Sequence, residues 1–284
     1  MPRVKFPLAL GLLAFSLSVF DVPAKEPKLK AEELVAKHLA SLGTPEARAA
    51  VKNRVVSGSA QMIPRLGGTG QLAGKGNILS EGRKLRFAMG FSALDYPGDQ
   101  IGFDGERMTV GQIRPGVRSD LSKFIYTYDM FMKEGLLGGV LSTAWPLLDL
   151  AARQPKLDYT GLKKIEGKQC HEVKYRAKKG SGDLQVSLDF DAESFRHVRT
   201  QYRLVQPPMM VSTPGQSSGQ RDTVYTLVEQ FDGFKEVDGL MLPHSYKLDL
   251  TIEGQDRTIM TEWVVAVTQI AHNQEIDPKY YVVQ

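Results

Sequence analysis

Apolar and polar residues alternate through most of this 284-residue chain, and this pattern restricts the fold to one built on antiparallel strands. The clearest case is the segment 84–91, where Leu85, Phe87, Met89 and Phe91 share one face. Successive strand residues point to opposite faces, so such a segment buries one face and leaves the other in water. The same period recurs in a series of segments, namely 54–62, 71–80, 158–165, 170–177, 184–190, 196–204, 223–234, 244–252 and 258–271.

Turn residues separate these strands, and Asp104-Gly105 is typical of a tight hairpin turn within 101–110. About ten such strands predict one curved or barrel-like antiparallel sheet, a mostly β fold with some helices (α+β). Leucines and valine at helical spacing predict a helix over 28–42, ended by Gly43, and a second short helix follows at 45–53. The first helix is expected to pack its apolar stripe on the sheet, with His38 at the edge of that stripe.

A second exception to the strand pattern lies at 120–150, where apolar residues follow a 3.6-residue period. Three glycines (Gly135, Gly138 and Gly139) interrupt this period, and Pro146 breaks it again. The segment therefore predicts a broken helical lid over the sheet, and we call it the insert.

The N-terminus has the pattern of a secretory signal. Arg3 and Lys5 precede an apolar run at 6–20, and Ala24 provides a small residue for cleavage. The run has about 15 residues, fewer than the roughly 20 that cross a bilayer as a helix. We expect cleavage near Ala24 and a single periplasmic or secreted domain over 25–284, with an uncleaved anchor as the alternative.

The formal net charge of +4 comes from scattered basic residues, which does not indicate nucleic-acid binding. A mildly positive surface weakly favours anionic headgroups or an acidic partner. Cys170 is the only cysteine, so no internal disulfide can form, and we expect a buried thiol. Its strand neighbours of equal parity, Glu172 and Lys174, leave half-exposure as the alternative.

Sequence motifs for catalysis are mostly missing. The segment 69–76 approaches a phosphate-binding loop but has Thr69 for the first glycine and Gly76 where Ser or Thr must stand. Cys170 and His171 would point to opposite faces of a strand, and the histidines lack metal-ligand spacing. No catalytic residue, metal site or cofactor is predicted, although a site assembled from distant residues stays open.

Apolar side chains are the remaining candidates for function. A curved sheet closed by a helical lid would enclose a concave apolar interior, where methionines adapt to ligands of variable shape. The alternative is an ordinary core, because buried apolar residues are the norm. The candidate ligand-binding residues lie on one strand, in the insert and at the tip of a loop: Phe87, Met89, Phe91, Phe124, Phe131, Leu137, Leu141, Trp145, Met209 and Met210.

The order of these elements resembles a known superfamily. A helix reading EELVAKHLASLG precedes RVVSGSAQM, FDGERMTV and the gapped FMKEGLLGGVLSTAW, and then GKQCHEVKY, LDFDAESFRHVRTQY and FDGFKEVDGLMLPHSYKL. This succession resembles the periplasmic lipoprotein-carrier superfamily, the LolA/LolB-like proteins of outer-membrane lipoprotein sorting. The resemblance implies an incomplete antiparallel barrel, a helical lid, an apolar cavity for acyl chains and no catalytic residues. This chain departs from the dedicated carriers in its length and in an extended loop at 206–221.

The leading hypothesis is a periplasmic carrier of lipid or lipoprotein acyl chains, with a lipid or acylated protein and a membrane-associated donor or acceptor as partners. An envelope sensor or protein-binding module without bound lipid is the first alternative. An enzyme with a site assembled from distant residues is the second.

Overall fold

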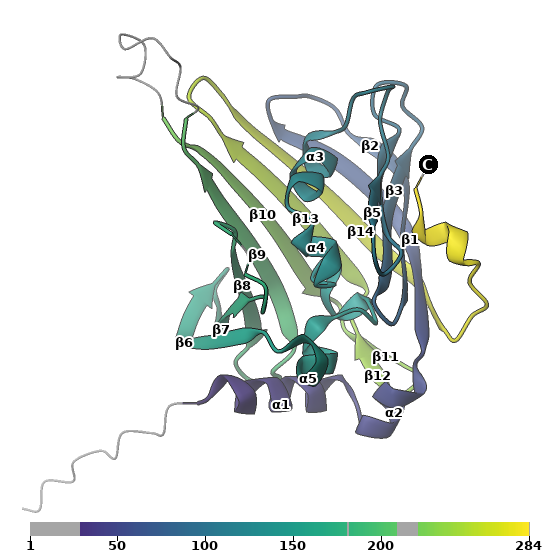
Figure 1. The fold of residues 1–284 in the computed structure, drawn as a ribbon, viewed down its shortest axis with the longest axis vertical. Helices are drawn as coiled ribbons and strands as arrows, with labels where there is room; N and C mark the ends of the chain where they lie inside the picture. The colour runs from purple at the N-terminus through teal and green to yellow at the C-terminus, as the bar shows by residue number, and fades with distance from the viewer. Residues whose placement is uncertain (1–28, 181, 209–220, 284) are drawn as a thin grey trace, which may run out of the picture.

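A 12-stranded antiparallel sheet dominates the computed structural model, which describes residues 29–180, 182–208 and 221–283 (Figure 1). The order across the sheet is β5-β4-β3-β2-β1-β14-β13-β10-β9-β8-β7-β6, so β5 and β6 form its two edges. The strands are β1 (Asn53–Leu66), β2 (Leu72–Glu81), β3 (Lys84–Phe91), β4 (Gly98–Phe103), β5 (Met108–Val110), β6 (Lys156–Ile165), β7 (Lys168–Arg176), β8 (Gln185–Asp191), β9 (His197–Gln206), β10 (Thr223–Asp232), β13 (Ser245–Glu253) and β14 (Thr258–His272).

The sheet curves without closing. In Figure 1, β2 to β5 stand on one side and β6 to β9 on the other, with the long strands β1, β14, β13 and β10 between them. Within the residues that the structure describes, the edge strand β5 pairs only with β4, and the edge strand β6 only with β7. The predicted class, a mostly β fold with an incomplete antiparallel barrel, is confirmed.

Each strand predicted from the alternation is present, with bounds shifted by a few residues. A short hairpin that the alternation did not predict, β11 (Lys235–Val237) with β12 (Leu240–Leu242), forms a separate two-stranded sheet. Its turn places Asp238 and Gly239 at φ 49° and 75°, which short polar or glycine residues adopt most easily.

Two helices precede the sheet. In α1 (Ala31–Leu42), the buried stripe is Leu34, Val35, His38 and Leu42. The helix α2 (Pro45–Ala50) begins where the Thr44 hydroxyl accepts a hydrogen bond from the Ala47 N–H at 3.2 Å. Thr44 is thus a capping residue with proline after it, the arrangement expected at a helix start.

The insert is a chain of short helices, as the glycines predicted. It contains α3 (Asp120–Thr127), α4 (Met130–Lys133), two 3-10 turns at Gly139–Leu141 and Pro146–Asp149, and α5 (Leu150–Arg153). Gly135 has φ 67°, and a Cβ there would lie 2.1 Å from the carbonyl oxygen of Ala144. Only glycine lets the chain fold back on itself at this point. Figure 1 shows α3 and α4 on the concave side, between the two walls of the sheet.

Among the described residues, none of the helices has both the length and the apolar character required to span a bilayer.

Candidate binding site inside the half-barrel

The sequence predicted a lid above an open apolar interior, whereas the structure shows the insert inside that interior. Phe87 and Met89 on β3 do face Leu141 of the insert. The gap left between them has a volume of about 10 Å³, which is about one water molecule. Its wall is completed by side chains of β1, β2, β13 and β14, among them Val56, Ile78, Tyr246 and Val265.

The other candidates are also packed against the sheet. Phe131 lies on the Tyr202 ring at 4.4 Å between centroids, and Phe124 stacks on Tyr225 at 5.3 Å. Phe91 stacks on Tyr96 at 5.5 Å. Leu137 has no exposed surface, Trp145 packs on His197 at 4.6 Å, and Met209 and Met210 lie outside the described residues.

A buried carboxylate on the sheet holds the middle of the insert. Glu229 of β10 accepts hydrogen bonds from the backbone N–H of Gly138 at 2.6 Å and from the hydroxyls of Tyr202 and Tyr246, each at 2.7 Å. Burial raises the pKa of Glu229 to about 7, although these three donors favour its ionised form. The insert is therefore attached here by a group that titrates near neutral pH.

A buried arginine makes the second attachment. Arg54 at the start of β1 donates to the carbonyl of Val140 at 2.5 Å and to Nε2 of His272 at 3.0 Å. His272 in turn donates from Nδ1 to Asp238 at 2.8 Å. Arg54 is only 4 % exposed, and burial lowers its pKa to about 10, so the guanidinium stays charged at neutral pH. Within the described residues it forms no ion pair with a carboxylate.

The start of the insert is held by Asp99 of β4. Its buried carboxylate accepts hydrogen bonds from the hydroxyls of Tyr96, Ser119 and Ser122. Ser119 also caps α3 by accepting from the Ser122 N–H at 2.9 Å. Burial raises the pKa of Asp99. These contacts fix the first turn of the insert to the sheet.

Two buried histidines lie at the other end of the insert. Nδ1 of His38 is 3.1 Å from the Phe195 carbonyl, and its Nε2 accepts from the Trp145 indole N–H at 3.4 Å. Burial lowers the pKa of His38 to about 4, so this histidine is neutral and ties α1 to the insert. His197, whose pKa burial also lowers, stacks on the same indole. Both histidines are structural contacts.

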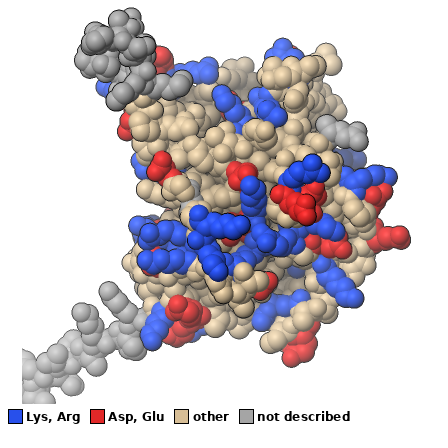
Figure 2. Space-filling model, viewed as in Figure 1, with Lys and Arg blue, Asp and Glu red and all other residues tan. Residues whose placement is uncertain are grey.

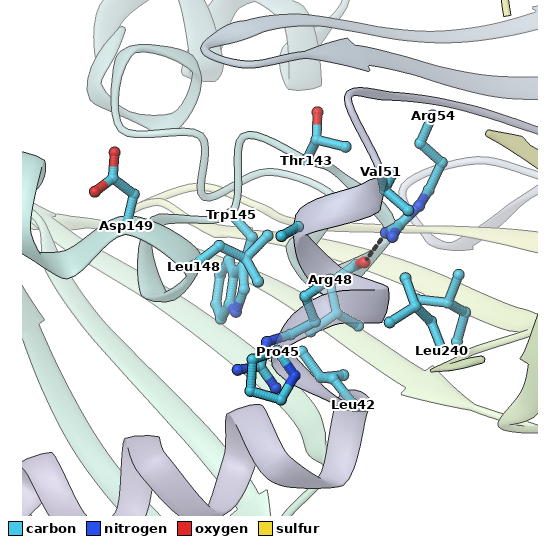
Figure 3. A pocket seen from close by; sticks show the side chains of 13 residues that line it. Leu42, Pro45, Arg48, Val51, Arg54, Thr143, Trp145, Leu148, Asp149 and Leu240 are labelled. Atoms are coloured by element: carbon cyan, nitrogen blue, oxygen red, sulfur yellow. Dashed lines mark hydrogen bonds between the residues drawn. The ribbon is translucent and has the colours of Figure 1, made fainter. Parts of the chain in front are cut away.

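A larger hollow, of about 400 Å³, opens beside this end of the insert (Figure 3). It lies where α1 and α2, the β11–β12 hairpin and the insert meet, and Leu42, Trp145, Leu148 and Leu240 form much of its apolar wall. Arg48 and Arg54 are its two basic residues. Figure 3 shows Trp145 and Leu148 beside α2, with the hydrogen bond from Arg54 drawn near Val51.

Basic side chains also gather on the outer surface. Figure 2 shows a band of Lys and Arg across the face seen in Figure 1, over the region of β6 to β8. A groove beside α4 and α5 has five basic residues and four acidic ones on its wall: Arg83, Lys133, Arg153, Lys178 and Lys179, with Glu106, Asp129, Glu134 and Asp149. Basic residues exceed acidic ones by one in that groove and also by one in the hollow, where Arg48 and Arg54 stand with Asp149; the hollow differs in containing the nearly buried guanidinium of Arg54.

The polar attachments were not predicted from the sequence, yet one signal was available. Glu229 shares strand parity with Leu227 and Phe231, so an acid stands on the buried face of β10. A charged residue at a buried position is a sign of a paired or functional group. Within the residues that the structure describes, no cluster of three His, Cys, Asp or Glu side chains is suited to hold a metal ion.

Comparison with known proteins gives matches only among solved structures. No family model matches the chain, and no curated protein matches it. A LolA superfamily protein from Nitrosomonas europaea is 12 % identical, with a TM-score of 0.46 over 88 % of this chain and 96 % of that one. A DUF1329 family protein from Desulfovibrio piger is 11 % identical, with a TM-score of 0.47 over the same shares.

A third match is a putative outer membrane lipoprotein-sorting protein domain from Vibrio parahaemolyticus. It is 9 % identical, with a TM-score of 0.43 over 89 % of this chain and 97 % of that domain. What the chain binds is argued below from its own geometry.

Proposed function

We propose that this chain is a carrier that binds the acyl chains of a lipid or lipoprotein inside the half-barrel when the insert moves outward. One observation carries the proposal: the concave side of the sheet is filled by a separate apolar segment rather than by a second sheet. That segment has no strand pairing to the sheet. It is held by discrete polar contacts, among them those of Asp99, Glu229 and Arg54.

The exchange follows from this arrangement. Outward movement of the 3-10 turn at Gly139–Leu141 would uncover the faces of Phe87 and Met89, which line the small gap with Leu141. An acyl chain in that place would gain about 0.8 kcal/mol for each methylene removed from water, before the cost of moving the insert. The proposal includes a periplasmic location and no catalytic step, and it makes residues 25–284 one domain.

The proposal is tested by locking the insert to the sheet. The hydroxyl of Ser80 on β2 accepts a hydrogen bond from the backbone N–H of Thr143 at 2.8 Å, so these two residues are neighbours across the boundary. Ser80→Cys with Thr143→Cys, in a Cys170→Ser background, allows a disulfide there. We expect oxidation to lower the affinity for a fluorescent fatty acid at least tenfold and reduction to restore it.

The two single-cysteine variants are the controls, and thiol titration confirms that the disulfide has formed. Undiminished binding by the oxidised double variant would show that the insert does not have to move. No binding by the unmodified protein would remove the carrier proposal.

A protein-binding module is the second candidate, favoured by the two unpaired edges of the sheet, β5 and β6. An extended segment of a partner could pair with such an edge through backbone hydrogen bonds. Natively purified protein distinguishes the two functions, since a carrier is expected to yield lipid in the mass spectrum and a module a bound polypeptide.

A further inference from the structure

The hollow beside the insert combines apolar walls with two arginines, Arg48 and Arg54, whose positive charges have no role in the carrier proposal. Arg48 of α2 donates from one terminal nitrogen, Nη1, to the carbonyls of Leu39 and Gly43, both at 2.5 Å. Arg54 uses Nε and Nη1 for His272 and Val140. A guanidinium has five N–H donors, so both groups retain donors for a further acceptor.

Neither arginine forms a direct salt bridge with an acid within the described part of the chain; Glu46 lies near Arg48, and Asp238 is linked to Arg54 through His272. The carboxylate on the wall of the hollow is Asp149, whose Oδ1 accepts from the Ala152 N–H. Figure 3 shows the Asp149 carboxylate turned away from Arg48 and Arg54. A nearly buried guanidinium with only neutral acceptors is costly, and an anion placed beside it would offset that cost.

The hollow and the small inner gap are neighbouring spaces along β1. Arg54 lines the hollow and Val56 lines the small inner gap, and the two residues share one face of the strand about 7 Å apart. On the insert, Val140 lines the hollow while its neighbour Leu141 lines the gap. The turn at Gly139–Leu141 is therefore the partition between the two spaces.

We propose that Arg48 and Arg54 bind the anionic headgroup of a single acyl amphiphile, a carboxylate or a phosphate, whose chain follows β1 past Leu141 into the half-barrel. This inference rests on the proposed carrier function and adds the class of ligand. An anion is a stronger acceptor for Arg54 than the Val140 carbonyl, so headgroup binding would release the partition from β1.

The test compares ligands with the same chain and different headgroups. Palmitate carries a carboxylate, palmitoyl lysophosphatidylglycerol a phosphate, and hexadecanol no charge. We expect at least one anionic ligand to bind the full chain at least tenfold more tightly than hexadecanol. Arg48→Gln should remove that difference and leave hexadecanol binding unchanged.

Arg86→Gln is the matched control, because Arg86 donates to Tyr280 and Gln100 away from the hollow. Arg54→Gln is the second variant, and it should act in the same direction as Arg48→Gln. Tighter binding of lysophosphatidylglycerol than of palmitate, lost in Arg48→Gln, would assign the site to phosphate headgroups. The reverse order would assign it to carboxylates.

The position of the headgroup has a separate readout. Trp145 lines the hollow, and Trp263 is the other tryptophan of the chain. In a Trp263→Phe variant, palmitate brominated beside the carboxylate should quench the Trp145 fluorescence more than palmitate brominated at the chain end.

Three outcomes would overturn the inference. Equal affinity for all three ligands, unchanged by Arg48→Gln, would remove the headgroup site and leave the carrier function standing. No binding of any ligand would remove both. The reverse order of quenching would place the headgroup elsewhere.

Discussion

At the scale of single residues, the buried acids control how the insert is held. Glu229 is surrounded by two tyrosine hydroxyls and one backbone N–H, with no basic side chain hydrogen-bonded to it. Its pKa is raised to about 7 by burial, against an ordinary value of 4.5. The folded protein therefore binds a proton at pH values where the unfolded chain has lost it.

The sign of the pH effect follows from linkage. The contribution of Glu229 to stability is fully present below pH 4.5 and is lost as the pH rises through about 7. Relative to Glu229→Gln, we expect the wild-type free energy of unfolding to fall by about 3 kcal/mol at most across this window. Urea unfolding at a series of pH values measures the difference.

The variant serves as the reference because other groups titrate nearby. His38, with its pKa lowered to about 4, gives stability that is lost as the pH falls, which is the opposite sign. Subtracting the two curves removes this contribution. Parallel curves for wild type and Glu229→Gln would contradict the assignment.

At the scale of elements, the insert is defined by where its backbone bends. Gly135, Gly138 and Gly139 have φ values of 67°, 81° and 47°, and a Cβ on Gly139 would meet the Phe231 ring at 2.7 Å. These glycines let the short helices turn inside the half-barrel. At these positions a residue with a side chain would need an unfavourable positive φ and would lack space for its Cβ atom.

The bend at Gly135 provides the test of this account. Gly135→Ala places a Cβ 2.1 Å from the Ala144 carbonyl at a positive φ. We expect a loss of more than about 2 kcal/mol in the free energy of unfolding, measured by urea denaturation. Gly116→Ala is the control, because φ there is 77° but no atom lies within 4 Å, and about 1 kcal/mol of strain is expected. Equal losses in the two variants would show that the close contact with Ala144 is unimportant.

The sequence predicted the secondary-structure elements that a local residue pattern encodes. The period-two segments became strands, and burial of Cys170, which is 2 % exposed, is confirmed. The hairpin of β11 and β12 was missed because three residues are too few to show a period. The depth of the insert was also missed, since helical spacing identifies the apolar face of Phe131 and Leu141 but not how closely it approaches the sheet.

The attachments of the insert join residues that are far apart in the chain. Arg54 meets Val140, and Glu229 meets Gly138, across 86 and 91 positions. No local pattern encodes such pairs, although Glu229 on a buried strand face could have been noticed. The hollow was missed for the same reason, because its wall is assembled from α1, α2, β12 and the insert.

At the scale of the whole molecule, the sheet is an open trough whose interior is occupied by another part of the same chain. The core is continuous from α1 through the insert to both walls of the sheet. The two edge strands of the sheet, β5 and β6, each have one free side with no second strand paired to it within the described residues. In the proposed carrier, this trough is the place where the acyl chains would be held.

The export prediction belongs to this scale. Arg3, Lys5, the apolar run at 6–20 and Ala24 predict a cleaved secretory signal, which lies outside the described residues. Protein from the envelope fraction should have an N-terminus at or near Lys25, as read by N-terminal sequencing. Recovery of intact Met1 in the membrane pellet would contradict the prediction.

The buried insert has a consequence for affinity in the proposed carrier. Because Phe131, Leu137 and Leu141 already fill the trough, cargo does not enter water-filled space; it displaces side chains that are as apolar as itself. The insert therefore competes with cargo for the same space, and because it belongs to the same chain its local concentration does not change. The observed affinity is the free energy of burying the cargo minus the free energy of burying the insert. Such a balance favours transfer of the cargo to an acceptor. As the cargo leaves, the insert returns to the trough, so the apolar surface of the sheet is not exposed to water during the transfer.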